Sequence, residues 1–183
     1  MPAHEVRSVH RLCRFGPRRL RMKAARADRE VLRRIEAAFA EIARPPHFTD
    51  HTHCAECAEH EQRLQACAAR GRGLEDLAHA VWDPFCVALP ASFMYFFPSL
   101  ARLALASPDA EHGWYGAQLL FHLHETRRAN GFHALCTRPQ RAAVAALLRH
   151  LLETRAALID DPRDADAFVD CYCFWADAGG RLN

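Results

Sequence analysis

Histidines and cysteines gather in one short segment, residues 47–60, and their side chains could bind a transition metal. Thiolate and imidazole are the ligand types that zinc prefers, and four of them complete a tetrahedral structural site. Six such side chains lie in the segment: His47, His51, His53, Cys54, Cys57 and His60. We therefore predict a zinc site with ligands drawn from Cys54, Cys57, His51, His53 and His60.

The spacing within this segment favours a common site. Cys54 and Cys57 form a Cys-x-x-Cys pair where we expect a helix to begin, so both sulfurs face one side. His60 follows Cys57 by three residues and falls on the same helical face, while the loop histidines approach from the other direction. Asp50, Glu56 and Glu59 are near enough in sequence to orient the imidazoles as hydrogen-bond acceptors.

Other interpretations of the segment remain open. The histidines could be solvated in a polar loop while the cysteines pack against the first helix. The pair Cys54 and Cys57 could also act as a thiol–disulfide couple, since a helix N-terminus lowers a thiol pKa. The βαβ context of thioredoxin-like proteins is absent, however. His122 or His124 is a further candidate for a distant ligand.

Helical periodicity accounts for the elements that must position these side chains. No segment shows the alternating apolar and polar pattern of a half-buried strand. We predict helices over about residues 28–43 and 54–69, one from Pro90, one carrying residues 114–123, one opened by Thr137 and one after Pro162, with a short amphipathic turn at 74–81. The predicted fold is all-α, a single compact multi-helix domain with the His/Cys-rich loop between the first two helices.

Two of these boundaries have clear sequence signals. Pro45 and Pro46 end the first helix, because proline cannot continue a helical hydrogen-bond ladder. Thr137 and Gln140 form a capping box, in which each side chain bonds the backbone amide of the other residue. The apolar helix after Pro90 is the expected centre of the core.

The first 21 residues differ from the rest in charge. They hold six arginines against one glutamate, a local charge of +5, so that residues 22–183 carry −3 within the net charge of +2. We predict that residues 1–21 are a basic, disordered extension or an overcalled start, and that residues 22–183 form the domain. The segment has no apolar stretch typical of a secretory signal.

Composition limits the compartment and the partners. Half the residues are hydrophobic and a quarter are charged, as in ordinary globular proteins. Most of the eight cysteines are scattered among apolar residues, which favours free thiols in a reducing cytoplasm. The uncharged stretch at 85–101 is interrupted by Pro90 and Pro98, so we predict a buried helix and no membrane association.

Three segments together resemble a family of small bacterial proteins known only as a domain of unknown function. The segment from Asp50 to Glu59 is similar to that family's Asp-His…Cys-x-Glu-Cys-x-Glu signature. Phe93–Pro98 looks like its aromatic helix, and Thr137–Arg141 looks like its Thr-Pro-x-Gln-Arg helix start. Phe96, where a tyrosine is usual, and the later proline after Thr137 depart from the family pattern. The resemblance implies a helical cytosolic protein with functional weight on His51, Cys54, Glu56 and Cys57, and it implies no activity.

The leading functional hypothesis is a zinc-stabilised helical module that binds a protein partner or acts as an accessory factor, and not an enzyme. The second hypothesis is a metal-dependent hydrolase with Glu56 or Glu59 as the general base. The third is a nucleic-acid-binding accessory protein that uses the basic extension and the histidine-rich loop. The mildly acidic body argues against it, because a basic footprint normally covers one face of a domain. No small-molecule substrate can be identified from the sequence.

Overall fold

The computed structural model describes residues 17–69, 83–108, 110–111, 113–125, 131–159 and 162–177. The elements in chain order are α1 (Pro17–Phe39), α2 (Ala55–Ala69), the 3₁₀ helix η2 (Pro84–Val87), α3 (Pro90–Leu105), α4 (Tyr115–Glu125), α5 (Gly131–Leu135), α6 (Arg138–Arg155), the 3₁₀ helix η3 (Ala156–Leu158) and α7 (Pro162–Asp177). The described part of the chain has no strand beyond an isolated bridge between Thr49 and Ala88. The predicted all-α fold is confirmed.

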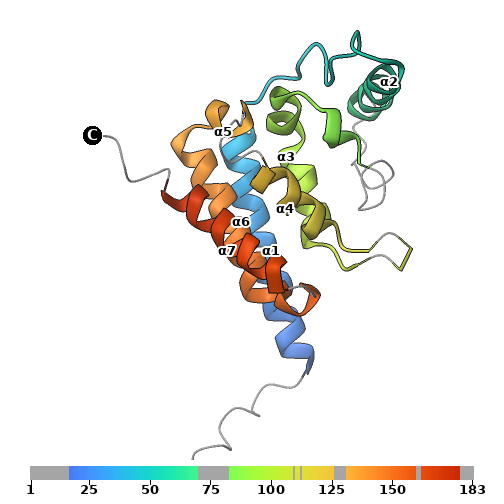
Figure 1. The fold of residues 1–183 in the computed structure, drawn as a ribbon. Coiled ribbons are helices and arrows are strands. Elements are labelled where there is room, and N and C mark those ends of the chain that lie inside the picture. The colour runs from blue at the N-terminus through green and yellow to red at the C-terminus, as the bar shows by residue number, and fades with distance from the viewer. Residues whose placement is uncertain are drawn as a thin grey trace, which may run out of the picture.

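Five helices form a closed ring around the core (Figure 1). α1 packs against α6 and α3, α6 against α7, α7 against α4, and α4 against α3. The enclosed side chains are large and apolar, and they include Ile35, Phe97, Leu100, Leu123, Leu147, Leu151, Phe168 and Trp175. The short helix α5 packs against α3. The apolar helix after Pro90 is thus central, as its periodicity predicts.

α2 lies outside this ring. Figure 1 shows it at one end of the molecule, and its closest packing partner is η2. The His/Cys-rich segment joins α1 to α2, as predicted. Cys57, His60, Leu64 and Cys67 form its buried face. Helical spacing predicts that these four residues share a face, and the structure confirms it.

Both ends of α1 differ from the sequence prediction. The helix begins at Pro17, inside the segment predicted to be an extension, and it ends at Phe39 before the expected stop near residue 43. Arginine is a good helix former, so residues 17–21 can continue the helix without an apolar stripe. Residues 1–16 and the predicted turn at 74–81 lie outside the described residues.

α6 begins with the predicted capping box. The Thr137 amide donates to Gln140 Oε1 at 2.8 Å, and the Thr137 side chain accepts from the Gln140 amide. Gln140 Nε2 also donates to the carbonyl of Ala38 at 3.1 Å, which ties the start of α6 to the end of α1.

A partly buried polar cluster joins the other ends of α1 and α6. His150 Nε2 lies 2.6 Å from Asp28 Oδ1, and the Arg155 guanidinium donates to both Asp28 oxygens at 3.1 and 2.9 Å. Burial alone would raise the pKa of Asp28, but the hydrogen bonds from Arg155 and His150 hold it below its usual value. The two helices are therefore bonded to each other near both ends.

Among the described helices, none is both long and apolar enough to cross a membrane.

Candidate metal centre

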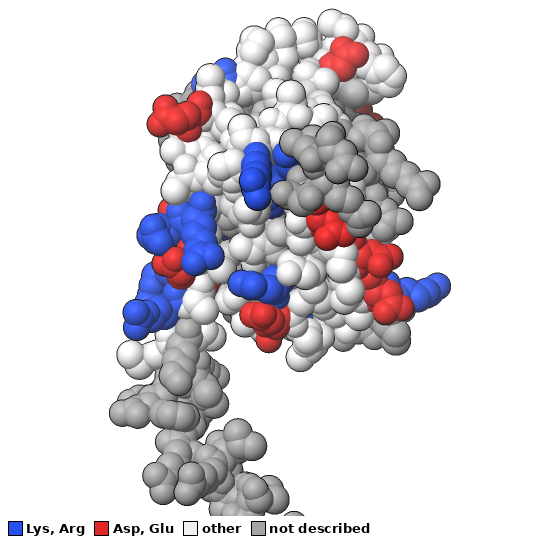
Figure 2. All heavy atoms as spheres, turned by 90° about the vertical axis from the view of Figure 1, so that its left-hand side faces the viewer, with Lys and Arg blue, Asp and Glu red and all other residues white. Residues whose placement is uncertain are grey.

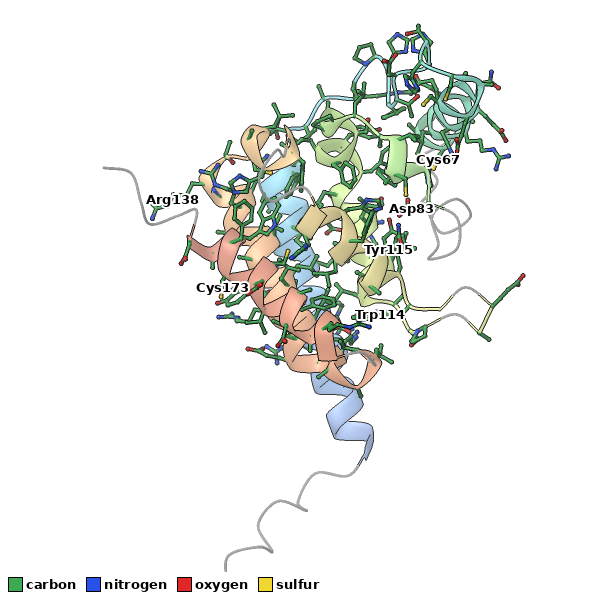
Figure 3. All side chains as sticks on the ribbon, viewed as in Figure 1. Cys67, Asp83, Trp114, Tyr115, Arg138 and Cys173 are labelled. Carbon is green, nitrogen blue, oxygen red and sulfur yellow. The ribbon has the colours of Figure 1, made fainter. Side chains whose placement is uncertain are left out.

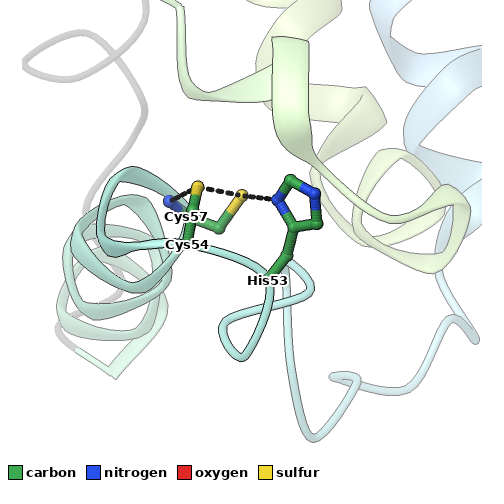
Figure 4. A group of neighbouring side chains, drawn as sticks. All are labelled: His53, Cys54 and Cys57. Atoms are coloured by element: carbon green, nitrogen blue, oxygen red, sulfur yellow. Dashed lines mark hydrogen bonds between the residues drawn. The ribbon is translucent and has the colours of Figure 1, made fainter.

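Three of the five predicted ligands converge at the start of α2 (Figure 4). The ligand atoms of His53, Cys54 and Cys57 all lie within 4.8 Å of one another. The two Sγ atoms are 3.4 Å apart, and Cys57 Sγ is 3.8 Å from His53 Nδ1. His53 and Cys54 are exposed, whereas Cys57 is buried. The cluster therefore opens to solvent on one side.

The helix start itself orients Cys54. Its carbonyl accepts the first helical hydrogen bond, from the Ala58 amide at 3.1 Å, so Cys54 occupies the N-cap position. Its Sγ accepts from the Cys57 amide at 3.5 Å, in the way that a serine or aspartate oxygen caps a helix. The sulfur thus lies at the positive end of the helix dipole, which stabilises a thiolate.

The surroundings of the two thiols shift their pKa values in opposite directions. The Cys57 backbone amide, the His53 side chain and the Cys57 thiol lower the pKa of Cys54 to about 7. The hydrogen bond with Cys54, together with burial, raises the pKa of Cys57. Cys54 in turn raises the pKa of His53, because a thiolate stabilises an imidazolium. Cys54 is therefore the more easily ionised ligand.

The spacing of the three donors fits a tetrahedral ion. With zinc–sulfur bonds of about 2.3 Å and zinc–nitrogen bonds of about 2.0 Å, a tetrahedral site has a sulfur–sulfur edge of roughly 3.8 Å and a sulfur–nitrogen edge of roughly 3.5 Å. The edges here are 3.4 and 3.8 Å. Both edges thus lie within about 0.4 Å of their tetrahedral values.

The structure does not bring His51 and His60 into this group. The His51 ring stacks on His47, with centroids 4.2 Å apart and an interplanar angle of 27°. His60 lies about 4.5 Å further along the helix axis than Cys57. Its ring is buried, with Nε2 at 3.7 Å from Glu56 Oε1.

The three acids predicted to orient the ligands have different roles. Asp50 Oδ1 accepts from the Thr52 hydroxyl at 2.8 Å within the loop. Glu59 pairs with Arg63 on the outer face of α2. Glu56 alone faces a histidine, His60, and its side chain is 74% exposed.

The acid that organises the segment is Glu61, which the sequence prediction missed. Its Oε2 accepts from the amides of Phe48 and Thr49 at 2.7 and 2.9 Å. Its Oε1 accepts from Gln65 Nε2 at 2.8 Å and lies 3.1 Å from His47 Nδ1. A sequence signal existed: Glu61 follows Cys57 by four residues, so it places a carboxylate on the buried face of α2.

The loop is also attached to α3 and to α2 by other bonds. The carbonyl of Phe48 accepts from the Leu89 amide at 2.8 Å and from Ser92 Oγ at 2.6 Å. Thr49 Oγ1 donates to the Cys57 carbonyl at 2.7 Å. Phe48 and Thr49, which precede the first predicted ligand His51 by three and two residues, are therefore bonded to α3 and to α2.

A second buried polar group lies between η2 and α4. Asp83 Oδ2 lies 2.7 Å from His122 Nε2 and accepts from the Tyr115 hydroxyl at 3.0 Å, and Figure 3 shows Asp83 and Tyr115 close together. Asp83 Oδ1 accepts from the Phe85 amide at 2.9 Å. Burial, followed by the charge of Asp83, raises the pKa of Tyr115 well above its usual value. His122 thus bonds to the Asp83 carboxylate, and it is not among the three residues whose ligand atoms converge at the start of α2.

Comparison of the chain with protein-family models, with curated proteins and with solved structures found no match. Inference about its function therefore depends on the site geometry. The described residues contain one group of three or more metal-binding side chains, formed by His53, Cys54 and Cys57.

Proposed function

We propose that this chain binds a zinc ion through His53, Cys54 and Cys57 and serves as an accessory, protein-binding module in the bacterial cytoplasm. The observation that carries the proposal is the convergence of one imidazole and two sulfurs within 4.8 Å. This donor set is typical of zinc, because it combines soft and borderline ligands.

The number of ligands bears on the role. Structural zinc sites are closed by four protein ligands, whereas three leave a position for another group. Since His53 and Cys54 are exposed, that position faces outward. A side chain of a partner protein could fill it, which supports an accessory role better than a purely internal staple.

The test is metal content measured on protein purified without a metal-affinity tag. Wild type should contain about one zinc per chain, and its cobalt form should show thiolate-to-cobalt charge-transfer bands and tetrahedral d–d absorption. A Cys54→Ser/Cys57→Ser double variant should lose both signals. Cys173→Ser is the matched control, because Cys173 is an exposed thiol on α7. A wild type without stoichiometric metal, or cobalt without sulfur bands, would rule out this site.

A thiol–disulfide couple is the second candidate function. It is favoured by the 3.4 Å sulfur–sulfur distance and by the exposed Cys54, with its lowered pKa, preceding the buried Cys57. The reduction potential of the pair can be measured by equilibrating the protein in glutathione redox buffers and determining the fraction that holds the Cys54–Cys57 disulfide. A couple more reducing than about −300 mV would be typical of a structural disulfide and not of a catalytic one.

The hydrolase alternative depends on Glu56, since Glu59 already pairs with Arg63. Zinc with three ligands could hold a water molecule, and the exposed Glu56 carboxylate could accept its proton. An exchangeable water on the cobalt form, together with metal-dependent turnover that Glu56→Gln abolishes, would favour this enzyme. A nucleic-acid role gains no support from the face in Figure 2, where Lys and Arg side chains are interspersed with Asp and Glu.

A further inference from the structure

We propose that Glu61 is the positioning residue of the metal centre: it holds the loop that carries His53 in register with the helix that carries Cys57. The inference rests on the proposed zinc site. Glu61 contacts none of the three ligand side chains in the hydrogen bonds described above, so its effect is on their relative placement.

The environment of Glu61 is that of an anchor. The residue is only 7% exposed, and a buried carboxylate is costly unless hydrogen bonds compensate it. Both of its oxygens are used, Oε2 by the two loop amides of Phe48 and Thr49 and Oε1 by Gln65 and His47. These bonds lower the pKa of Glu61 although burial, the largest single influence, acts to raise it. The carboxylate therefore accepts these bonds in its charged form, and charge-assisted bonds are the strong class.

The anchored residues lead directly to the ligands. Thr49, whose amide bonds to Glu61, donates its hydroxyl to the carbonyl of Cys57. Asp50 follows, and its carbonyl accepts from the His53 amide at 3.0 Å, which closes the turn that carries the imidazole. Glu61 lies one helical turn beyond Cys57 on the same helix. One carboxylate thus sets the position of His53 relative to the two sulfurs.

The other attachments of the loop indicate what substitution of Glu61 would do. The bonds from Leu89 and Ser92 to the Phe48 carbonyl tie the loop to α3, and they do not involve Glu61. Without Glu61 the loop would keep these bonds to α3 and the single bond from the Thr49 hydroxyl to the Cys57 carbonyl, but it would lose the two amide bonds that fix its register on α2. Cys54 and Cys57 would stay together, because both belong to the start of α2.

The test is a comparison of Glu61→Leu, Glu61→Gln and Glu59→Gln for cobalt and zinc affinity. Loss of a residue that orients metal ligands typically costs 10–100-fold in affinity, and we expect about that loss for Glu61→Leu. Glu61→Gln keeps one oxygen for the two loop amides, so its loss should be smaller. Glu59→Gln removes the same charge from the outer face of α2 and should bind like wild type. Thiolate band intensity per bound cobalt should not change in any of them.

A double-mutant cycle with His53→Ala separates positioning from general destabilisation. If Glu61 acts through His53, its substitution should have no further effect on metal affinity once the imidazole is gone. An equal loss in both backgrounds, or no loss in the wild-type background, would overturn the inference. If circular dichroism shows that Glu61→Leu loses helix content, the same double-mutant cycle is measured with Glu61→Gln in its place.

Hydrogen exchange in metal-free protein supplies a readout that is independent of zinc. The amides of Phe48 and Thr49 should exchange faster in the Glu61 variants, and unchanged protection would also overturn the inference. If wild type binds no metal while the Glu61 variants show this loss of protection, the zinc site is refuted and the anchoring role of Glu61 stands. A wild type that binds metal as tightly as its Glu61 variants would refute only the positioning role.

Discussion

Cys54 and Cys57 differ in solvent exposure although two residues separate them. Cys54 caps α2 from the outside and carries the lowered pKa, while Cys57 begins the buried face of the helix. This difference bears on both proposed roles of the pair, metal ligation and thiol–disulfide exchange. The reactivity of the two thiols with an alkylating agent distinguishes them directly.

In reduced, metal-free protein, the rate at which iodoacetamide alkylates Cys54 should rise with pH, with a midpoint near pH 7, and level off above it. The thiolate is the nucleophile, and the pKa of Cys54 is about 7. Cys86 is the internal control, because it is also an exposed residue. Partial desolvation of its thiol, followed by the charges of Asp83 and Glu56, raises its pKa. Its rate should still be rising above pH 9.

Peptide mass spectrometry gives both profiles in one experiment. Added zinc should protect Cys54 and leave Cys86 unchanged. A midpoint for Cys54 near 9, the ordinary value for a thiol, would mean that the helix start does not stabilise its thiolate.

Asp83 is the other residue at which a single change should be costly. Its carboxylate serves His122, Tyr115 and the Phe85 amide, and its side chain is only 2% exposed. Removing a buried carboxylate deprives its hydrogen-bond donors of their acceptor, at about 1–3 kcal/mol for each buried group, and we expect Asp83→Ala to lower the free energy of unfolding by about 3 kcal/mol or more. Urea denaturation followed by circular dichroism measures it.

Asp166→Ala is the matched control, since Asp166 is exposed on α7. A surface substitution of this kind should stay within about 0.5 kcal/mol of wild type. Equal effects of the two substitutions would mean that the Asp83 cluster contributes nothing specific.

At the scale of elements, apolar periodicity predicted the long helices well. The stripe through Ile35 and Phe39 is buried, and the capping box at Thr137 opens α6. α5 was missed because its five residues, from Gly131 to Leu135, are too few to display a helical period. The early start of α1 was missed because its first turns have no apolar stripe to signal them.

The site was predictable in part for a similar reason. Residue type and spacing identified His53, Cys54 and Cys57, since adjacent donors at a helix start converge through local geometry. Spacing could not show that His51 stacks on His47, because that contact depends on how the loop folds back. It also could not identify the loop amides that Glu61 binds, which lie 12 and 13 residues away in sequence.

Removal of residues 1–21 tests which part of α1 contributes to the stability of the domain. Met22 is 72% exposed, and Asp28 is the residue that bonds α1 to α6 near this end. A chain starting at Met22 should therefore melt within a few degrees of the full chain. A chain starting at Arg29 loses the Asp28 cluster and should melt at a clearly lower temperature. A large drop already at Met22 would mean that the first turns of α1 pack on the domain.

At the scale of the whole molecule, the metal centre sits on α2, outside the five-helix ring (Figure 1). From sequence alone, metal would be expected to fasten α2 to α1. In the structure, α1 packs mainly against α6 and α3, and α2 packs against η2. The proposed metal should therefore stabilise α2 and its loop separately from the ring.

Chelation should consequently act locally. We expect a strong chelator to speed amide exchange in residues 47–69 while the ring helices keep their protection, because local units can open without global unfolding. Hydrogen–deuterium exchange with and without chelator measures the pattern, and Cys54→Ser/Cys57→Ser should reproduce it without chelator. Loss of protection throughout α6 and α7 would show that the metal supports the entire fold.

The partnership between α1 and α6 also has a consequence during synthesis on the ribosome. α1 ends at Phe39, but its main partner is complete only at Arg155. At about 5–20 residues per second, the part of α1 that packs on α6 waits on the order of ten seconds before it can be covered, although α3 is made earlier. During that interval the nascent chain exposes an amphipathic helix, which is the kind of surface that molecular chaperones bind.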